Sequence, residues 1–247
     1  MVSVIIPAAG QGRRMQAHHN KVFLMLAKEP ILVHTLRQFA EVEDVGECIV
    51  VVGKGEEKET FELLKSASSV HSLPDCRIVT GGEERQDSVW NGLQVVSPDA
   101  DIVLVHDAAR PLVTPAIIGR VIRAARRTGG AVAAVPVKDT IKVAGDDGNV
   151  ASTPDRSTLW AVQTPQGFQK DLLVRANEQA IADGFRGTDD ASLVERLGMP
   201  VELSLGSYEN IKITTPGDLI IAESFWKARQ ESDEIMVPGR VGRGLRA

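Results

Sequence analysis

The sequence predicts an α/β domain built on a doubly wound, mainly parallel β-sheet. Short β-branched runs without polar alternation recur along the chain, which is typical of strands covered on both faces. Segments with apolar residues three or four positions apart lie between these runs, as expected of amphipathic helices. Strands that alternate with helices in this way imply right-handed crossovers. A ligand is then expected at the carboxyl ends of the strands.

The first half of the chain contains most of this alternation. Strands are predicted at 2–6, 47–53, 76–80, 101–106 and 131–137. Helices are predicted between them at 30–40, 56–67, 83–96 and 115–127. In the first of these helices, Leu32, Leu36 and Phe39 follow one another at intervals of four and three residues, which places them on one face.

The alternation breaks after Val137. Residues 138–143 alternate polar and apolar side chains, 144–149 read A-G-D-D-G-N, and strand-like residues resume near Val150. This pattern predicts a hairpin arm at about 138–158. A two-stranded ribbon is unstable in isolation, so we expect the arm to pack against a partner subunit in a homodimer.

The remaining elements complete the domain. A strand at 160–163, helices at 171–182 and 189–197, a strand at 201–205 and a last helix at 216–229 are predicted. The chain of 247 residues, with 43% apolar and 25% charged residues, fits one compact domain, which we assign to 1–230. Residues 231–247 carry glycine, arginine and little apolar content, and are expected to form a loose tail.

Charge and cysteine content exclude several classes of protein. The formal charge of −5 disfavours nucleic acid binding through a broad basic surface, so an anionic ligand requires a local basic pocket. Cys48 and Cys76 are too few for a disulfide framework and lack metal-ligand spacing, which indicates buried thiols in a reducing cytoplasm. The apolar start at 2–9 is too short for a membrane span and lacks a cleavage region, so no membrane association is expected.

The first predicted strand leads into a turn of small residues. Residues 7–15 read P-A-A-G-Q-G-R-R-M, and the backbone amides of such a turn can approach a phosphate chain closely. Arg13, Arg14 and Lys21 supply the cations that a triphosphate requires. A dinucleotide-binding fingerprint would have glycine in place of Met15. The turn therefore predicts a phosphate site and disfavours an NAD(P)-dependent oxidoreductase.

Polar residues follow two more of the predicted strands. The fourth strand ends in H-D-A-A-R-P at 106–111, where Asp107 is suited to hold Mg²⁺ or a ribose hydroxyl. The alternative is that Asp107 caps a turn and pairs with Arg110. His106, on a strand with apolar neighbours, indicates a core histidine. In the G-G-E-E-R-Q-D-S segment at 81–88, the glycines allow close approach of a flat base, but taken alone this segment favours a plain helix N-terminus with acidic first-turn residues.

Taken together, these motifs resemble a known enzyme family. The segments that carry the resemblance are A-A-G-Q-G-R-R-M at 8–15, Lys21, G-G-E-E-R-Q-D-S-V at 81–89, H-D-A-A-R-P at 106–111, K-D-T-I-K at 138–142, D-R at 155–156, Q-T-P-Q at 163–166, T-D-D-A-S at 188–192 and N-I-K-I-T at 210–214. In this order they resemble 2-C-methyl-D-erythritol 4-phosphate cytidylyltransferases of the non-mevalonate isoprenoid pathway. The resemblance extends from residue 2 to about residue 229.

The resemblance implies a Rossmann-like nucleotidyltransferase fold, CTP as a substrate with Mg²⁺ at Asp107, and specific roles for individual residues. The residues that match the nucleotide site are Pro7, Ala8, Ala9, Gly10, Gly12, Gly82, Ser88, Asp107 and Ala108. The residues that match the catalytic cations are Arg14, Lys21 and Lys212, the last in an alternating, strand-like segment. The residues that match the acceptor phosphate site are Arg110, Thr140, Arg156, Thr164 and Thr188, of which Thr140 and Arg156 come from the partner's arm in the family.

The implied reaction is an in-line attack by a phosphate oxygen of methylerythritol phosphate on the α-phosphorus of CTP, without a covalent enzyme intermediate. Arg14, Lys21 and Lys212 would stabilise the charge that builds on this phosphorus. The family usually has P-K-Q-Y or P-K-Q-F where this chain has Asn20-Lys21-Val22-Phe23. Loss of the proline is expected to loosen the loop that aims Lys21, which affects the rate more than the type of reaction.

Three other functions are compatible with parts of the sequence. A cytidylyltransferase for another polyol phosphate, such as ribitol 5-phosphate, shares the glycine loop and a similar H-D-x-x-R-P segment, and a methyl branch changes binding by only about 1–3 kcal/mol. An NAD(P)-dependent oxidoreductase and a non-catalytic nucleotide-binding regulator are the alternatives from other classes. The basic residues around the glycine loop disfavour both.

Overall fold

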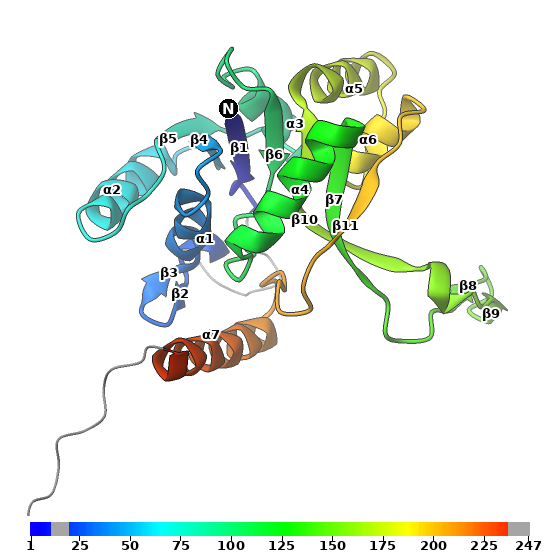
Figure 1. Ribbon diagram of the computed structural model, residues 1–247. Helices are drawn as coiled ribbons and strands as arrows, with labels where there is room; N and C mark the ends of the chain where they lie inside the picture. The colour runs from blue at the N-terminus through cyan, green and yellow to red at the C-terminus, as the bar shows by residue number, and fades with distance from the viewer. Residues whose placement is uncertain (11–19, 237–247) are drawn as a thin grey trace, which may run out of the picture.

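The computed structural model describes residues 1–10 and 20–236. Its centre is a seven-stranded sheet with the strand order β11-β7-β10-β6-β1-β4-β5 (Figure 1). The strands are β1 (Val2–Pro7), β4 (Val45–Val52), β5 (Cys76–Thr80), β6 (Ile102–Val105), β7 (Gly130–Pro136), β10 (Trp160–Gln169) and β11 (Glu202–Leu205). The neighbours of β10 pair with it antiparallel, and the other neighbouring pairs are parallel. The predicted mainly parallel sheet is confirmed.

Helices cover both faces of the sheet. The helices that bury side chains in one core are α1 (Ile31–Ala40), α2 (Glu57–Ser68) and α4 (Pro115–Thr128). The helices that bury side chains in the other core are α3 (Arg85–Leu93), α5 (Lys170–Ala182) and α6 (Asp190–Arg196). β1 divides its side chains between the two cores, since Val4 and Ile6 face the first and Ile5 faces the second. This explains why its sequence has no polar alternation.

The strand order creates a switch point at the centre of the sheet. The chain passes from β1 outward to β4 and β5, and then returns to the other side of β1 as β6. The carboxyl ends of β1 and β6 therefore lie side by side while their connections diverge. In open α/β sheets this arrangement produces a crevice for ligands, and here Gly10 and Asp107 follow the two strands.

The last helix is longer than predicted. α7 (Pro216–Met236) continues beyond residue 229, so 231–236 are helical rather than part of a loose tail. Ala222 of α7 joins a third, smaller apolar cluster with Leu26 and Ile213. Leu26 belongs to a short hairpin of β2 (Met25–Leu26) and β3 (Glu29–Pro30), which the sequence patterns did not indicate. No helix in the part of the chain that the structure describes is long and apolar enough to cross a membrane.

The predicted hairpin is present but shorter than its sequence pattern. β8 (Val143–Ala144) and β9 (Val150–Ser152) pair antiparallel, whereas residues 138–142 form no strand. The polar-apolar alternation there was misleading because an exposed segment has no buried face to select one conformation. Figure 1 shows this arm (residues 138–158) extending away from the body of the molecule.

Both cysteines are free thiols. Cys48 is buried in β4, and burial raises its pKa well above the ordinary value. Cys76 is half-buried, and burial together with Asp75 raises its pKa to about 12. Because the thiolate is the reactive form, both side chains are inert, neutral groups at physiological pH.

Candidate functional site

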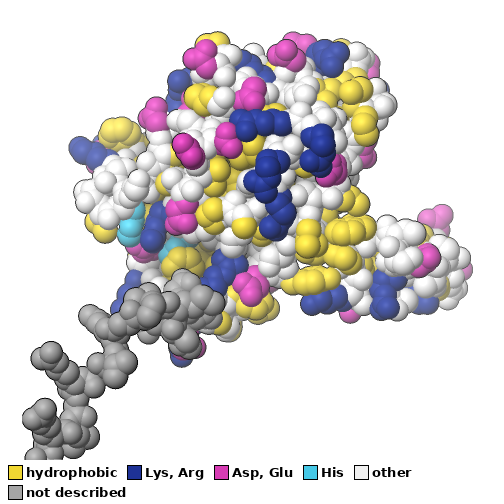
Figure 2. All heavy atoms as spheres, in the orientation of Figure 1, with side chains coloured by type: hydrophobic (Ala, Val, Ile, Leu, Met, Phe, Trp, Pro, Cys, Tyr) yellow, Lys and Arg dark blue, Asp and Glu magenta, His cyan; other side chains and the backbone are white. Residues whose placement is uncertain are grey.

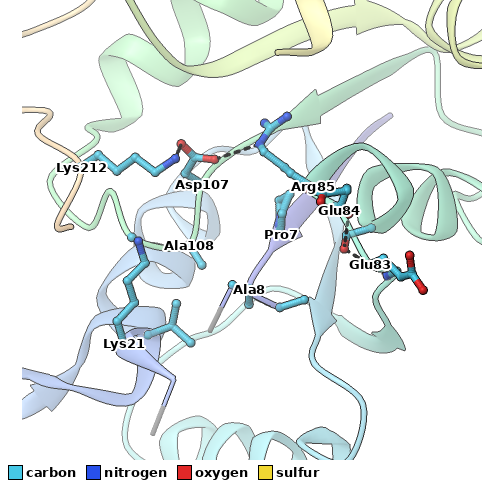
Figure 3. Close-up of a pocket in the computed structure, with 15 residues that line it drawn as sticks. Pro7, Ala8, Lys21, Glu83, Glu84, Arg85, Asp107, Ala108 and Lys212 are labelled. Carbon is cyan, nitrogen blue, oxygen red and sulfur yellow. Dashed lines mark hydrogen bonds and ion pairs between the residues drawn. The ribbon is translucent and has the colours of Figure 1, made fainter. Parts of the chain in front are cut away.

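A pocket lies at the switch point of the sheet (Figure 3). The residues that line it are Pro7, Ala8, Ala9, Gly10, Lys21, Val22, Gly82, Glu83, Glu84, Arg85, Ser88, Asp107, Ala108, Ala109 and Lys212. They follow β1, β5 and β6 or belong to the short 3-10 helix η2 (Lys21–Phe23), the start of α3 and the segment before α7. Segments from across the sequence thus meet at one edge of the sheet.

Small residues form the wall of the pocket between β1 and α3. A Cβ atom on Gly81 would lie 2.7 Å from the Ser88 Oγ and 2.8 Å from the Ala9 Cβ, so glycine is needed there. The backbone N–H of Gly82 donates to the Ser88 Oγ at 3.2 Å, and the Ser88 hydroxyl donates to the Glu84 carbonyl at 3.1 Å. We call this part of the pocket, lined by Ala8, Ala9, Gly82 and Ser88, the small-residue slot.

Asp107 is the electrostatic centre of the pocket. Its Oδ2 lies 2.8 Å from the Lys212 Nζ and 3.6 Å from the Arg110 Nε, and its Oδ1 lies 3.4 Å from the Arg85 Nε. Figure 3 shows Lys212 and Arg85 approaching this carboxylate from opposite sides. Burial alone would raise the pKa of Asp107, but Arg85, Lys212 and Arg110 hold it well below the ordinary value. The carboxylate is therefore ionised at any physiological pH.

Two buried polar side chains hold the end of β6 behind Asp107. The Thr164 Oγ1 accepts a hydrogen bond from the Asp107 backbone N–H at 3.0 Å and lies 3.1 Å from the His106 Nδ1. Because burial lowers the pKa of His106 to about 4, the ring is neutral. The Thr164 hydroxyl then donates to Nδ1, and Nε2 donates to the Arg110 carbonyl at 3.2 Å. His106 is thus a core histidine, as predicted.

The segment that carries Lys212 is attached to the same strand end. The Ile213 N–H donates to the Ala109 carbonyl at 2.8 Å, and the Asn210 side chain donates to the Thr164 carbonyl at 2.9 Å. These contacts bring Lys212 to Asp107 from a point more than a hundred residues later in the chain. The expectation of a strand here was wrong, since residues 210–214 have no regular structure. The Lys212 side chain still reaches the pocket because these backbone contacts direct it there.

Asn20 fixes the position of Lys21. The Asn20 Nδ2 donates to the carbonyl oxygen of Ala8 and, at 3.0 Å, to the Glu56 Oε2. Its Oδ1 accepts from the Val22 N–H at 3.3 Å and caps η2. Asn20 is 5% exposed, so these bonds are shielded from water. The asparagine thus connects Lys21 to the residue directly after β1, and the expected loosening of this loop stays a prediction.

The structure brings together most of the predicted nucleotide-site residues. Those that line the pocket are Pro7, Ala8, Ala9, Gly10, Lys21, Gly82, Ser88, Asp107, Ala108 and Lys212. Gly12 and Arg14, as well as Arg13 and Met15, lie outside the described residues. Figure 3 shows the Lys21 side chain extending toward the segment that carries Asp107 and Ala108.

The predicted acceptor residues do not line this pocket. Arg110 and Thr164 lie behind Asp107, where Arg110 donates to the Asn210 carbonyl at 2.7 Å. Thr188 is exposed on the loop before α6. Thr140 and Arg156 are exposed on the arm, which points away from the body (Figure 1). Their roles remain predictions.

Sequence reasoning missed Arg85 and Asp190. Arg85 lines the pocket and bonds the Asp190 Oδ2 at 2.8 Å as well as facing Asp107. The only available signal was the position of Arg85 directly after G-G-E-E. In that segment, only the glycines and Ser88 were interpreted as part of the nucleotide site. Asp190 lies in the T-D-D-A-S segment at 188–192, where only Thr188 was given a role, because a carboxylate at the start of a helix is common.

The pocket suits a cation that arrives with a phosphorylated ligand. The described residues contain no group of three or more histidine, cysteine or acidic side chains that could hold a metal. The buried, ionised carboxylate of Asp107 matches Mg²⁺, which is usually held by one or two carboxylates together with substrate phosphates and water. Asp107 therefore fits such a role, and Lys21 and Lys212 add positive charge for phosphate oxygens.

Comparison with known proteins identifies a single family. The family model described as 2-C-methyl-D-erythritol 4-phosphate cytidylyltransferase matches residues 2–228. A protein of that name from Symbiobacterium thermophilum is 55% identical over 222 residues, covering 90% of this chain and 91% of the relative. Another from Caldanaerobacter subterraneus is 50% identical over 224 residues, covering 91% and 98%.

Solved structures agree with the sequence matches. The crystal structure of 4-diphosphocytidyl-2C-methyl-D-erythritol synthase from Anaerococcus prevotii superimposes with a TM-score of 0.81 at 32% identity, covering 92% of this chain and 96% of that one. The 2-C-methyl-D-erythritol 4-phosphate cytidylyltransferase from Thermus thermophilus gives a TM-score of 0.74 at 36% identity, covering 91% and 98%.

Proposed function

Because the chain belongs to the 2-C-methyl-D-erythritol 4-phosphate cytidylyltransferase family, whose members transfer CMP from CTP to methylerythritol phosphate in isoprenoid biosynthesis, we propose that this transfer takes place in the pocket between β1 and β6. The observation that carries the proposal is the convergence of Lys21, Lys212 and the Asp107 carboxylate on one cavity beside a slot of small residues. The base of CTP is assigned to the small-residue slot, and its phosphates are assigned to the part of the pocket that Lys21 and Lys212 line.

The proposed reaction is a direct displacement at phosphorus. A phosphate oxygen of the acceptor forms a bond to the α-phosphorus of CTP, and the bond from that phosphorus to the bridging oxygen of pyrophosphate breaks. The electron pair leaves with pyrophosphate, which carries the released charge. Lys21, Lys212 and Arg14 are assigned to stabilise the negative charge on the α-phosphate oxygens during this step.

In the free protein Lys212 is paired with Asp107 at 2.8 Å. When CTP is bound, the ammonium group of Lys212 is assigned to the phosphates, while Arg85 and Arg110 remain beside the Asp107 carboxylate. When bound, Mg²⁺ neutralises phosphate oxygens and orients the triphosphate. Asp107 is the carboxylate assigned to hold it.

The acceptor is assigned to residues on two chains. Thr188, Thr164 and Arg110 are on the same chain as the pocket, whereas Thr140 and Arg156 are on an arm that points away from it (Figure 1). The arm is therefore assigned to the site of another subunit. Free cysteine thiols are consistent with reaction in the cytoplasm, which assay of the activity in fractionated cells would test.

Exposed apolar side chains support a homodimer. Val162 of β10, Leu203 and Leu205 of the edge strand β11, and Tyr208 are 43%, 45%, 57% and 44% exposed. Figure 2 shows hydrophobic side chains gathered where the arm leaves the body. An open edge strand with apolar side chains tends to pair with another chain.

We expect the protein to have twice the mass of one chain in light scattering. Replacing Leu205 by aspartate, which introduces charge into the proposed interface, is expected to give monomers with a raised KM for the acceptor. Replacing the exposed Ile181 of α5 by aspartate is the control and is expected to leave the dimer intact. A wild-type protein that is monomeric and fully active would disprove this assembly.

One assay tests the proposed reaction. Purified protein is mixed with CTP and either methylerythritol phosphate, ribitol 5-phosphate or no acceptor, and pyrophosphate is measured. Release is expected to be fastest with methylerythritol phosphate and to stop when EDTA removes divalent metal, with recovery on adding Mg²⁺. Equal release with ribitol 5-phosphate would contradict the assigned acceptor, and release that persists in EDTA would contradict the assigned metal.

A further inference from the structure

Arg85 contacts two carboxylates, Asp107, which lines the pocket, and Asp190, which is buried outside it. Its Nη2 donates to the Asp190 Oδ2 at 2.8 Å, and its Nε faces the Asp107 Oδ1 at 3.4 Å. Asp190 is the first residue of α6 and is 1% exposed. Asp107 follows β6. One guanidinium thus links the nucleotide side of the site with the helix that follows the Thr188 loop.

The contact with Asp107 fixes one oxygen of the carboxylate. Lys212 and Arg110 approach Oδ2, whereas Arg85 approaches Oδ1. When Lys212 turns to phosphate in the proposed reaction, Arg85 is still in place to limit rotation of the carboxylate. Only a planar group with several donors in fixed directions makes both contacts, which a lysine ammonium does not replace.

The neighbours of Arg85 bind the same loop. The Gln86 side chain donates to the Phe185 carbonyl at 3.2 Å and accepts from the Gly187 N–H at 3.0 Å. Asp87 forms an ion pair with Arg186. Three consecutive residues in the first turn of α3 therefore hold the loop 185–190, which carries the exposed Thr188, while Gly82 just before them lines the nucleotide slot.

The loop is held from its other side by β10. The Gln166 side chain donates to the Asp189 Oδ2 at 2.8 Å and accepts from the Ala191 N–H at 3.0 Å. Gln166 is 2% exposed, so these bonds are well protected. The loop 185–190 is thus supported on both sides, and Arg85 is the support that also reaches Asp107.

We propose that Arg85 is a positioning residue for the transfer reaction, which orients Asp107 for the metal and, through Asp190, holds the loop 185–190 for the acceptor. This inference rests on the proposed function. The competing explanation is that Arg85 only neutralises a buried carboxylate, since burial raises the pKa of Asp190 even with Arg85 beside it. The two explanations differ in what happens when the charge of Asp190 is removed as well.

The test compares Arg85→Gln, Asp190→Asn and the double variant with the wild type. Thermal unfolding, kcat, the acceptor KM and the half-saturating Mg²⁺ concentration are measured for each. Arg85→Gln is expected to lower the unfolding midpoint, to lower kcat by about 10- to 100-fold, and to raise both the acceptor KM and the Mg²⁺ requirement. Asp190→Asn is expected to raise the acceptor KM and to leave the Mg²⁺ requirement unchanged.

The double variant distinguishes the two explanations. With the buried charge gone, its unfolding midpoint is expected to recover, so it stays folded even if Arg85→Gln does not. Its kcat and Mg²⁺ requirement are expected to remain impaired. Recovery of both to wild-type values would show that Arg85 serves the fold alone. Arg126→Gln is the control, because Arg126 pairs with Asp44 at 2.9 Å and with Asp101 at 3.0 Å at the opposite end of β6, and is expected to match the wild type in kcat, acceptor KM and Mg²⁺ requirement.

Failure of the proposed transfer reaction can be distinguished from failure of the role proposed for Arg85. A wild-type protein that releases no pyrophosphate with any acceptor would refute the transfer but still allow binding of Mg-CTP to be measured by calorimetry. Weaker Mg-CTP binding by the double variant than by the wild type would then support the orienting role of Arg85. Equal binding would overturn it.

Discussion

Replacing Lys21 by alanine is expected to lower kcat for CMP transfer by about 10²-fold or more. Lys21 lines the pocket and extends toward the segment with Asp107 and Ala108 (Figure 3), where it is assigned to the α-phosphate. A cation that is held in place stabilises the developing charge more than water does, because its orientation is fixed before the reaction. Pyrophosphate release under saturating substrates measures the effect.

Lys58→Ala is the matched control for this variant. Lys58 is exposed on α2, so its loss removes one positive charge without touching the pocket and is expected to leave kcat unchanged. Arginine at position 21 keeps the charge but not its shape, and is expected to recover only part of the rate. Turnover by Lys21→Ala equal to that of the wild type would remove Lys21 from the catalytic set.

Variants of Asn20 are expected to lower kcat less than Lys21→Ala does. Asn20→Ala leaves the Ala8 carbonyl without this donor and is expected to lower kcat by about tenfold, a smaller loss than for Lys21→Ala, because the lysine remains but is less well aimed. Asn20→Asp places a carboxylate beside the Ala8 carbonyl and Glu56 and is expected to be slower than Asn20→Ala. Full activity in both would show that other contacts position Lys21.

Replacing Asp107 by asparagine is expected to lower kcat by about 10²-fold and to raise the half-saturating Mg²⁺ concentration. Asparagine keeps the size of the side chain but removes the charge that holds a divalent cation. It also leaves Arg85, Arg110 and Lys212 close together without their common counter-ion. Since the Asp107 side chain is 10% exposed, we expect a loss of about 3 kcal/mol in the free energy of unfolding.

Asp101→Asn is the control at the opposite end of β6. Asp101 is half exposed and pairs with Arg126 at 3.0 Å, so its replacement is expected to cost under about 1 kcal/mol and to leave the Mg²⁺ requirement unchanged. A Mg²⁺ titration in which Asp107→Asn coincides with the wild type would overturn the assigned role of Asp107.

The lowered pKa of Asp107 determines how its contribution to the stability of the folded state depends on pH. A carboxylate whose pKa falls on folding stabilises the folded state above its unfolded pKa and loses this effect only as the pH falls through the folded value. The pKa of Asp107 in the folded protein is far below the ordinary value for an aspartate. Loss of Mg²⁺-dependent activity between pH 7 and about 5 would therefore arise from other groups.

The sequence patterns were informative where structure is repetitive or where one residue type is required. β1, β5 and α4 lie close to their predicted positions, because buried strands and amphipathic helices repeat over several residues. The pattern failed at residues 138–142, which are exposed and have no buried face, and at residues 210–214, which are held by contacts with distant segments. Gly81 is an example of a required residue type, because a Cβ atom there would collide with Ser88 and Ala9.

The sequence by itself determined the order of strands and helices, the family and most of the residues of the nucleotide pocket, because those depend on local patterns and on motifs in a set order. Only the tertiary structure showed that Asn20 hydrogen-bonds the carbonyl of Ala8 directly after β1, that Lys212 forms an ion pair with Asp107, and that Arg85 contacts both Asp107 and Asp190. These contacts depend on distance and direction between residues far apart in the chain, and a side chain's partner is decided by how the elements pack.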